Sequence, residues 1–216
     1  DKFRKRTWEL MKERAEDVDL FVAVSDHYAA SMKSILEIPD HKLITHHIAL
    51  DPEDYRYRNS REKEPVIGFI SRMCEENGLE ILVEAFIQMK KREDMKNVRL
   101  MLTGGHTGAD DSYLRKVRSR IKSAGLQGEV IFHNDFEGEG RHAFFDQVSV
   151  ISVPVVQGEA FGLYLLESMA SGIPVVQPAL GAFPEIIKLA GGGVTYTPND
   201  PGSLAAALVE LINDRD

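Results

Sequence analysis

Two glutamates, Glu159 and Glu167, stand eight positions apart in a stretch that otherwise favours a turn and a buried helix. Between them, Phe161-Gly162-Leu163 predicts the turn that opens the helix. The first N–H groups of a helix have no intrahelical partner and lie at the positive end of its dipole, so this turn suits a phosphate. A carboxylate among apolar neighbours needs hydrogen-bond donors, and the hydroxyl groups of a sugar or a ribose are such donors.

A structural role is the alternative for each glutamate. Glu159 can be a solvated loop residue, since most glutamates lie at the surface. Glu167 can pair with an arginine or cap a backbone N–H group. Taken alone, each glutamate favours the structural interpretation, because isolated charged residues usually serve solubility or pairing.

A third candidate group, Arg72, follows an apolar run that ends at Ile70. A guanidinium at the mouth of a strand can hold a diphosphate through two parallel hydrogen bonds. The alternative is a surface salt bridge with Glu75 or Glu76. Residues 71–78 therefore predict either an anion-binding loop or a charged surface loop.

Residues 104–108, with the sequence GGHTG, form a glycine-rich turn after another apolar run. Backbone N–H groups of such a turn can cradle a phosphate, but a plain connection is the favoured interpretation because glycine turns are common. The turn does not match the dinucleotide fingerprint G-x-G-x-x-G, which disfavours an NAD enzyme. Glu185, after Pro184, is interpreted as a charge favoured at the start of its helix.

His46 and His47 are the residues that suggest a metal site. Adjacent side chains on a strand point to opposite faces, so the two imidazoles are poorly placed to share an ion. The sequence has no further cysteine or histidine pair at ligand spacing. We therefore expect no bound metal.

The composition favours a soluble globular protein. The chain has 216 residues, of which 43% are hydrophobic and 28% charged. A net charge of −8 argues against nucleic acid as a general partner. The single cysteine, Cys74, cannot form an internal disulfide, and we find no membrane-spanning run or signal-peptide core, so a cytoplasmic protein is expected.

From residue 65 onward, strand and helix patterns alternate regularly. The predicted strands span residues 66–70, 98–103, 129–133, 148–153, 175–176 and 194–196. The predicted helices span residues 79–89, 113–124 and 141–147, one that follows Gly162, and one that starts at Pro184. Repeated units of this length predict an α/β fold with a Rossmann-like, doubly wound parallel sheet. In such sheets ligands bind beyond the carboxyl ends of the strands, where the candidate residues lie.

Ahead of this region the pattern is different. Residues 1–17 predict an amphipathic helix, and short apolar runs at 18–24 and 42–46 predict strands. Between them a helix is predicted over residues 28–36, with Ser25 as its N-cap. Residues 51–64 are dense in charge and poor in apolar residues, which indicates a linker.

Three motifs occur in order and together resemble a known family: E-x-F-G-L from Glu159, L-E-x-M-A-x-G-x-P-V-V from Leu166, and P-E-I-I from Pro184. With the E-x7-E spacing, they are similar to the retaining glycosyltransferases of the GT-B fold, which include sucrose synthases, glycogen synthases and many bacterial lipopolysaccharide and mannosyl transferases. The segment ALDPEDY, which ends at Tyr55, resembles the motif that joins the two domains of that fold.

The resemblance implies a domain division. Residues 1–50 would be the tail of the N-terminal, acceptor-side domain, 51–64 the interdomain linker, and 65–216 the C-terminal nucleotide-sugar-binding domain. On this interpretation the chain is a piece of a longer enzyme and lacks most of the acceptor-side domain. We expect such a fragment to transfer little sugar by itself.

The resemblance also implies roles for the candidate residues. Arg72 and the backbone amides of Phe161-Gly162-Leu163 would hold the diphosphate of the donor. Glu159 would contact the transferred sugar. Glu167 would bind the hydroxyl groups of the ribose.

Other members of the family have the pattern G-R-L-x-x-x-K-G in the loop of Arg72, whose arginine and lysine grip the donor phosphates. Here Ser71 replaces the glycine and Asn77 replaces the lysine, so Asn77 can donate a hydrogen bond but brings no charge. His133 and Asn134 stand where the family seats the nucleobase, largely through backbone contacts.

The function implied is transfer of a sugar from a nucleoside-diphosphate sugar, such as a UDP or GDP sugar, to an acceptor with retention of configuration. The family needs no cofactor and usually no metal. The acceptor can be a sugar, a lipid-linked sugar or another molecule, and the longer enzyme can contact a membrane peripherally. The alternatives are a weak or inactive nucleotide-sugar-binding module, suggested by Asn77, and an epimerase or hydrolase of the same fold.

Overall fold

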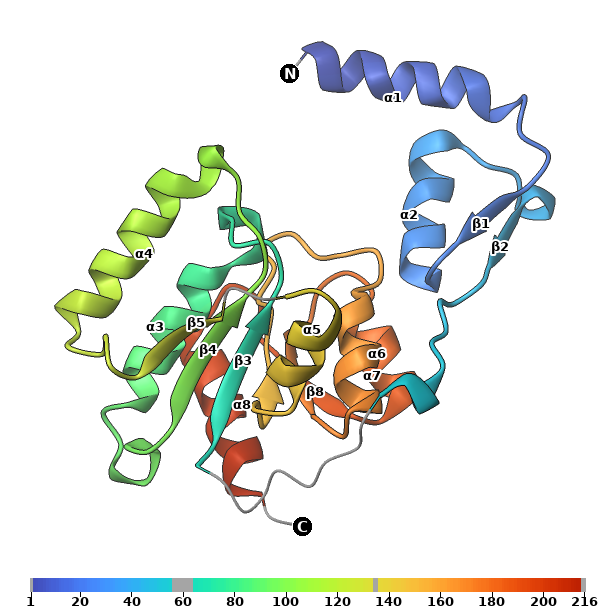
Figure 1. The fold of residues 1–216 in the computed structure, drawn as a ribbon. Helices are drawn as coiled ribbons and strands as arrows, with labels where there is room; N and C mark the ends of the chain where they lie inside the picture. The colour runs from blue at the N-terminus through green and yellow to red at the C-terminus, as the bar shows by residue number, and fades with distance from the viewer. Residues whose placement is uncertain (1, 56–63, 134–135, 215–216) are drawn as a thin grey trace.

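The computed structural model describes residues 2–55, 64–133 and 136–214 of the chain. These residues form two sheets, a two-stranded one near the N-terminus and a six-stranded one that starts at residue 66 (Figure 1). Among the helices of the described residues, none combines the length and the hydrophobicity that a membrane span requires.

The six-stranded sheet is parallel throughout and has the order β5-β4-β3-β6-β7-β8. Its strands are β3 (Val66–Ile70), β4 (Arg99–Thr103), β5 (Val130–His133), β6 (Val150–Ile151), β7 (Val175–Pro178) and β8 (Gly193–Tyr196). The chain starts in the middle at β3, adds two strands on one side, and then crosses over to add three on the other. The order reverses between β3 and β6, which is the point where doubly wound sheets bind their ligands. The predicted fold class is confirmed.

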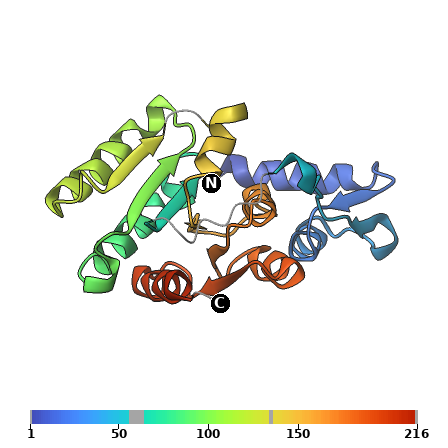
Figure 2. The ribbon, with the colours of Figure 1, turned by 60° about the horizontal axis from the view of Figure 1, so that its bottom comes forward.

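Helices cover both faces of this sheet (Figures 1 and 2). They are α3 (Leu79–Met89), α4 (Asp111–Ser123), α5 (Gly138–Phe145), α6 (Leu163–Ala170), α7 (Phe183–Ala190) and α8 (Pro201–Asn213). Helix α3 packs against α4 and α8, and α8 also contacts β7 and β8. Short 3-10 turns include η4 (Glu75–Asn77) and η6 (Gly108–Asp110), which both lie in loops after strands.

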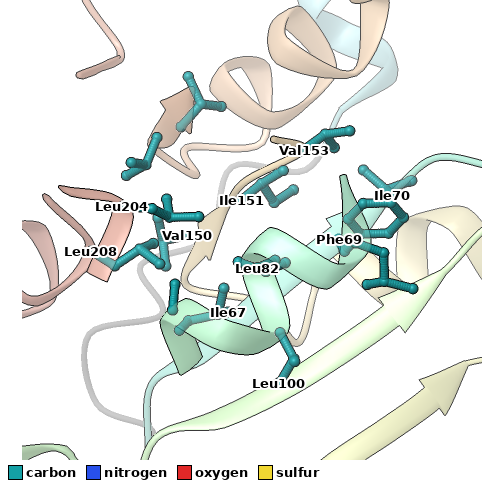
Figure 3. Close-up of a cluster of buried hydrophobic side chains, with 14 of the residues drawn as sticks. Ile67, Phe69, Ile70, Leu82, Leu100, Val150, Ile151, Val153, Leu204 and Leu208 are labelled. Carbon is teal, nitrogen blue, oxygen red and sulfur yellow. The ribbon is translucent and has the colours of Figure 1, made fainter. Parts of the chain in front are cut away.

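Strand β3 lies at the centre of the hydrophobic core. Its residues Ile67 and Phe69 are fully buried, and they gather with Leu82 of α3 and with Leu204 and Leu208 of α8 (Figure 3). A parallel strand that is buried on both faces needs apolar residues at nearly every position, which explains the continuous sequence VIGFI.

Gly68 lets α5 approach the opposite face of β3. A Cβ atom at this position would lie 2.9 Å from the ring of Phe144 and 2.9 Å from a methyl group of Val148. Because Phe144 is itself fully buried, α5 is held firmly against the strand. This contact fixes the helix that carries one of the site residues described below.

The N-terminal segment contains α1 (Lys2–Ala15), β1 (Phe21–Ala23), α2 (Asp26–Leu36) and β2 (Leu43–Thr45), with short turns η1 (Asp40–Lys42) and η2 (Pro52–Asp54). Strands β1 and β2 pair in parallel, and α1 packs on α2 without burying any of its own residues. Ser25 caps α2 as predicted, because its hydroxyl accepts a hydrogen bond from the N–H of Tyr28 (3.1 Å).

Several predicted elements differ from those observed in their bounds. The strand predicted over residues 148–153 is reduced to Val150–Ile151, and Pro154, which has no N–H to donate, follows soon after it. Helix α5 begins at Gly138 rather than at Arg141, because tertiary packing overrides the poor helix propensity of its two glycines. Most of the predicted linker, residues 56–63, lies outside the described residues, and the predicted domain division stays a prediction.

Candidate functional site

The loops that follow β3 and β6 meet at the switch point of the sheet. The N–H of Val156 donates to the carbonyl of Glu76 (2.9 Å). At Gly78, where φ is +68°, an added Cβ atom would lie only 1.9 Å from the carbonyl oxygen of Pro154. The topology therefore brings together two loops that carry candidate residues, Arg72 in one and Glu159 in the other.

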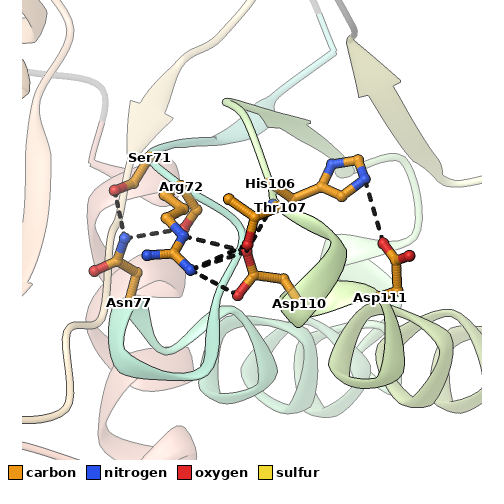
Figure 4. A network of polar contacts seen from close by, with 7 residues as sticks. All are labelled: Ser71, Arg72, Asn77, His106, Thr107, Asp110 and Asp111. Carbon is orange, nitrogen blue, oxygen red and sulfur yellow. Dashed lines mark hydrogen bonds and ion pairs between the residues drawn. The ribbon is translucent and has the colours of Figure 1, made fainter.

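Arg72 belongs to a polar network at the end of β3 and β4 (Figure 4). Its Nε and Nη2 atoms donate to the carboxylate of Asp110 at 3.0 to 3.2 Å, and Nη2 also lies 3.4 Å from the hydroxyl of Thr107. The hydrogen bond to Asp110 raises the pKa of the guanidinium above its usual value. The backbone N–H and hydroxyl of Thr107 lower the pKa of Asp110, and Arg72 lowers it further.

The salt bridge with Glu75 or Glu76 that was the alternative for Arg72 is not the one observed. The partner of Arg72 is Asp110, from the loop after β4, and the predicted diphosphate contact stays a prediction. Half of the Arg72 side chain remains exposed, at 53%, so it stays open to solvent at the sheet edge. A ligand phosphate would have to share the guanidinium with Asp110.

Asn77 fastens the same loop from within. Its Nδ2 atom donates to the hydroxyl of Ser71 (2.8 Å) and to the carbonyl oxygen of Arg72 (2.9 Å). Both residues that depart from the family pattern, Ser71 and Asn77, thus hydrogen-bond to one another (Figure 4). The amide stabilises the loop and brings no charge to it.

Packing against the loop after β3 explains the need for glycine in the turn after β4. At Gly104 φ is +119°, and an added Cβ atom would lie 1.9 Å from the carbonyl oxygen of Ser71. The N–H of Met73 also donates to the carbonyl of Gly105 (2.9 Å). Close contact between the two loops therefore accounts for Gly104 without a bound phosphate.

Helix α6 begins in the predicted glycine turn. Gly162 has φ of +86°, and an added Cβ atom would crowd the side chains of Leu165 and Phe183 at 2.9 and 3.0 Å. Phe161 is buried whereas Leu163 is exposed, so the turn lies at the boundary between core and solvent. The unpaired N–H groups that any first helical turn carries are thus located in the loop after β6.

Glu159 precedes this turn and is an exposed residue whose carboxylate reaches Tyr164. The phenol of Tyr164 donates to Oε2 of Glu159 at 3.1 Å. Desolvation by the surrounding protein raises the pKa of Glu159, and the hydrogen bond from Tyr164 opposes that rise. The backbone is also fixed, because the N–H of Ala182 donates to the carbonyl of Glu159 (3.0 Å).

Glu167 lies in α6 with only 5% of its surface exposed. Arg141 of α5 donates from Nε to Oε1 (2.9 Å) and from Nη2 to Oε2. The phenol of Tyr55 lies 3.3 Å from Oε1, and its ring packs 6.0 Å from that of His142. The arginine partner considered as an alternative is present, and the predicted ribose contact stays a prediction.

His133 ends β5, at the carboxyl edge where the nucleobase was predicted. Its Nε2 atom hydrogen-bonds with the carbonyl of Gly140 in α5 (3.1 Å), and its own carbonyl accepts from the hydroxyl of Thr103 (2.9 Å). The side chain is therefore already engaged in holding α5. Asn134, the other residue assigned to the base, lies outside the described residues.

Glu185 lies in the first turn of α7, as expected, but its carboxylate serves another helix. It accepts from the N–H groups of Asp26 (2.8 Å) and His27 (3.0 Å) at the start of α2, and Nε2 of His47 lies 2.6 Å away. Beside this contact, the Ser25 hydroxyl donates to the carbonyl of Ala160 (2.7 Å). The N-terminal segment is thus attached next to Glu159.

Asp26, His47 and Glu185 are close enough to hold a metal ion, with their ligand atoms within 4.8 Å of one another. The hydrogen bonds that Glu185 receives from α2 explain this grouping as a helix cap. The expectation that the protein uses no metal remains a prediction.

Four residues of the site were not predicted from the sequence. They are Tyr55, Asp110, Arg141 and Tyr164. For Asp110 a signal existed, since Thr107 three positions earlier forms a capping box with it. The pair of Arg141 and Glu167 has no local signal, because it joins two helices 26 residues apart.

Residues 64–214 match the profile of a family described as glycosyl transferases group 1. An uncharacterized glycosyltransferase of Methanocaldococcus jannaschii is 26% identical over 206 residues, which cover 89% of this chain and 50% of that protein. A D-inositol 3-phosphate glycosyltransferase of Corynebacterium diphtheriae is 30% identical over 152 residues, which cover 69% of this chain and 34% of the relative. The chain thus spans half or less of the length of these relatives.

Solved structures share the fold. Sucrose-phosphate synthase from Thermosynechococcus elongatus superposes with a TM-score of 0.83 at 21% identity, over 97% of this chain and 53% of that one. The Anabaena protein HepE in complex with UDP and glucose gives a TM-score of 0.79 at 20% identity, over 91% and 54% of the two chains. At such identities the likeness establishes the fold, which is the GT-B arrangement.

Proposed function

Because the chain belongs to the glycosyl transferases group 1 family, we propose that it binds the nucleoside-diphosphate sugar donor of a retaining glycosyltransferase. The observation that carries this proposal is the contact between the loops after β3 and β6, which places Arg72 and the start of α6 at one edge of the sheet. Transfer itself is proposed for a longer protein that contains this chain, since the relatives are at least twice the matched length.

The diphosphate of the donor would lie between Arg72 and the first turn of α6. A guanidinium binds phosphate oxygens in pairs, and the N–H groups of Phe161, Gly162 and Leu163 add donors without a net charge. Both kinds of group oppose the negative charge that grows on the diphosphate as the sugar leaves. No metal is required for this role.

The two glutamates would bind opposite ends of the donor. Glu159, whose carboxylate is oriented by Tyr164, would accept hydrogen bonds from hydroxyl groups of the sugar. Glu167 would accept hydrogen bonds from the hydroxyl groups of the ribose. HepE has been solved with UDP and glucose and with UDP-glucose, which supports a nucleotide sugar as ligand. The base would lie near His133 at the end of β5, and Asn134 stays its second predicted contact.

The chemical step needs no side-chain nucleophile in this proposal. The bond between the anomeric carbon and the diphosphate oxygen would break, and the bond to the acceptor oxygen would form on the same face of the sugar, so that the configuration is retained. The proton of the acceptor hydroxyl would pass to the departing diphosphate. The protein would contribute position and charge stabilisation, with Arg72 and the α6 turn acting on the leaving group.

Ligand binding tests the proposal directly. UDP, GDP and ADP are titrated into the chain by calorimetry, and at least one is expected to bind and to raise the melting temperature. Glu167→Ala is expected to weaken binding of that nucleotide about 10-fold, since it removes hydrogen bonds to a charged group. The same substitution should leave the affinity for the 2′,3′-dideoxy counterpart nearly unchanged. Equal losses for both ligands would refute the ribose role of Glu167.

A binding module without transfer is the second candidate. It is favoured by Asn77, which is tied to Ser71 and Arg72 where the family has a lysine, and by the pairing of Arg72 with Asp110. One cation fewer at the leaving group would slow transfer by roughly 100-fold, equivalent to a few kcal/mol. Sugar transfer and donor hydrolysis by the longer protein separate the two candidates, because robust transfer excludes the binding-only function.

A further inference from the structure

We propose that Arg141 is a positioning residue for the donor nucleotide, which acts by holding the carboxylate of Glu167 in the orientation that accepts the ribose diol. The inference rests on the proposed function, because it requires that a nucleotide binds at α6. It adds a residue from α5 to that site and explains how a buried carboxylate can serve a ligand.

Glu167 needs a fixed cation because it is almost completely buried. Burying a carboxylate without a partner has a large free-energy cost. The ion pair with Arg141 therefore allows Glu167 to occupy its buried position in α6. Arg141 meets both oxygens, Nε with Oε1 at 2.9 Å and Nη2 with Oε2. Two parallel hydrogen bonds from a planar fork fix the plane of the carboxylate as well as its place.

The guanidinium is itself held in place. Its carbon lies 5.8 Å from the ring centre of Phe145, and the neighbouring Phe144 packs against β3 at Gly68. Helix α5 is thus fixed to the middle of the sheet, and the orientation of Glu167 depends on the sheet rather than on a loop. With 31% of its side chain exposed, Arg141 stands at the edge of the site and not deep in the core.

Counting acceptor positions shows what remains for a ligand. A carboxylate offers about two lone pairs on each oxygen. Among the described contacts, Oε1 accepts from Arg141 and Tyr55, whereas Oε2 accepts from Arg141. One ribose hydroxyl can therefore bind Oε2 directly, and the second can replace the phenol of Tyr55, whose 3.3 Å hydrogen bond is the longest of the three.

Substitutions of Arg141 test the proposal. Arg141→Met keeps most of the apolar stem and removes the fork, and it is expected to weaken binding of the best of UDP, GDP and ADP about 10-fold. Arg141→Lys keeps the charge but not the two parallel hydrogen bonds, so an intermediate loss is expected. Both variants should bind the 2′,3′-dideoxy nucleotide within about twofold of the unsubstituted chain, because that ligand has no hydroxyl for Glu167.

Two controls distinguish a specific effect on nucleotide binding from a general loss of structure. In the Glu167→Gln background, where the buried charge is absent, Arg141→Met should have no further effect on binding of the ribonucleotide. Tyr55→Phe keeps the ring against His142 and removes only the phenol, so its affinity is expected to equal or exceed that of the unsubstituted chain. Folding of every variant is followed by circular dichroism and thermal unfolding.

The outcomes distinguish failure of the proposed function from failure of the positioning role. If none of the three nucleoside diphosphates binds the unsubstituted chain, the proposed function fails and the inference fails with it. If one of them binds, two results overturn only the positioning role. In the first, the Arg141 variants bind the ribonucleotide as tightly as the unsubstituted chain does. In the second, their affinities for the ribonucleotide and the dideoxynucleotide fall equally. An equal loss from Tyr55→Phe would also overturn it, because the phenol would then contribute as much as the fork.

Discussion

The two glutamates of the candidate site carry the same functional group in different surroundings. Glu159 is exposed and receives a phenol hydrogen bond from Tyr164, while the surrounding protein raises the pKa of its carboxyl. Glu167 is buried and is paired with a guanidinium. The first is free to meet a ligand from solvent, whereas the second can accept only what its partners leave open. This difference is consistent with their proposed roles, in which Glu159 binds the sugar and Glu167 binds the ribose.

Gly78 decides whether the loops after β3 and β6 can touch. Gly78→Ala places a methyl group 1.9 Å from the carbonyl oxygen of Pro154 and also forces φ of +68° on an alanine. We expect the free energy of unfolding to fall by about 3 kcal/mol or more, because both the strained backbone and the steric clash contribute. Chemical unfolding with urea measures the change.

Gly125→Ala is the matched control for this substitution. Gly125 has φ of +73° but nothing lies within 4 Å of an added Cβ atom, so only the backbone cost of about 1 kcal/mol is expected. A similar loss in both variants would mean that the loops at the switch point separate easily, and would contradict the close contact between them.

At the level of elements, the start of α2 depends on a residue far along the chain. Ser25 caps the helix locally, and Glu185 of α7 adds a second cap across 159 positions of sequence. Because the same stretch donates to the carbonyl of Ala160, the start of α2 and the turn before α6 are fixed to one another. The N-terminal segment is thereby oriented against the candidate site.

Glu185→Gln tests this second cap. Desolvation raises the pKa of Glu185, but hydrogen bonds from the Asp26 and His27 amides and from His47 outweigh it, so the pKa lies below the ordinary value of 4.5. A lowered pKa means that the ionised carboxylate stabilises the fold above about pH 4.5 and that this stabilisation is lost as the pH falls below it. We expect the variant to lose about 1 kcal/mol at pH 7.

The difference in the free energy of unfolding between Glu185→Gln and the unsubstituted chain should shrink when urea unfolding is repeated at pH values from 7 down to 3.5. Glu210→Gln, on the exposed side of α8, is the control for loss of one carboxylate and should stay within about 0.5 kcal/mol of the unsubstituted chain. A difference at Glu185 that does not change with pH would show that the carboxylate charge contributes nothing to the cap.

For the whole molecule, burial is distributed unevenly. The six-stranded sheet and its helices share one hydrophobic core, whereas α1 has no buried residue and, within the described part of the chain, packs mainly on the neighbouring α2. Regions with few buried apolar contacts open with a small free energy, even when their hydrogen bonds are regular. Figure 1 shows the resulting separation, with α1 standing clear of the sheet.

Amide hydrogen exchange should reveal this unevenness. Helices α1 and α8 have 14 and 13 residues, but α8 buries Leu204, Ala205 and Leu208. We expect amides of α1 to exchange orders of magnitude faster than those of α8, whose protection should approach that of β3 and β4. Comparable protection in α1 and α8 would indicate that α1 is covered in solution, by a second copy or by another part of a longer protein.

Most elements of the sheet could be predicted from local pattern. The strand at residues 66–70 and the helix at 79–89 were predicted with their observed bounds, because uninterrupted apolar runs and helical spacing are strong local signals. The turn at Gly162 was also predicted and is confirmed. The strand after residue 148 was predicted too long, since apolar character continues into the loop where Pro154 ends the pairing.

The sequence by itself determined the alternation of strands and helices and the doubly wound class, since both depend on neighbours within a few positions. It also singled out Arg72, Glu159, Glu167 and Glu185 as charged groups at the ends of predicted elements. Only the tertiary structure decided their partners: Asp110 for Arg72, Arg141 for Glu167, and the start of α2 for Glu185. These contacts join segments 26 to 159 residues apart. Charged side chains pair with whatever the strand order brings within a few ångströms, and local periodicity does not specify that order.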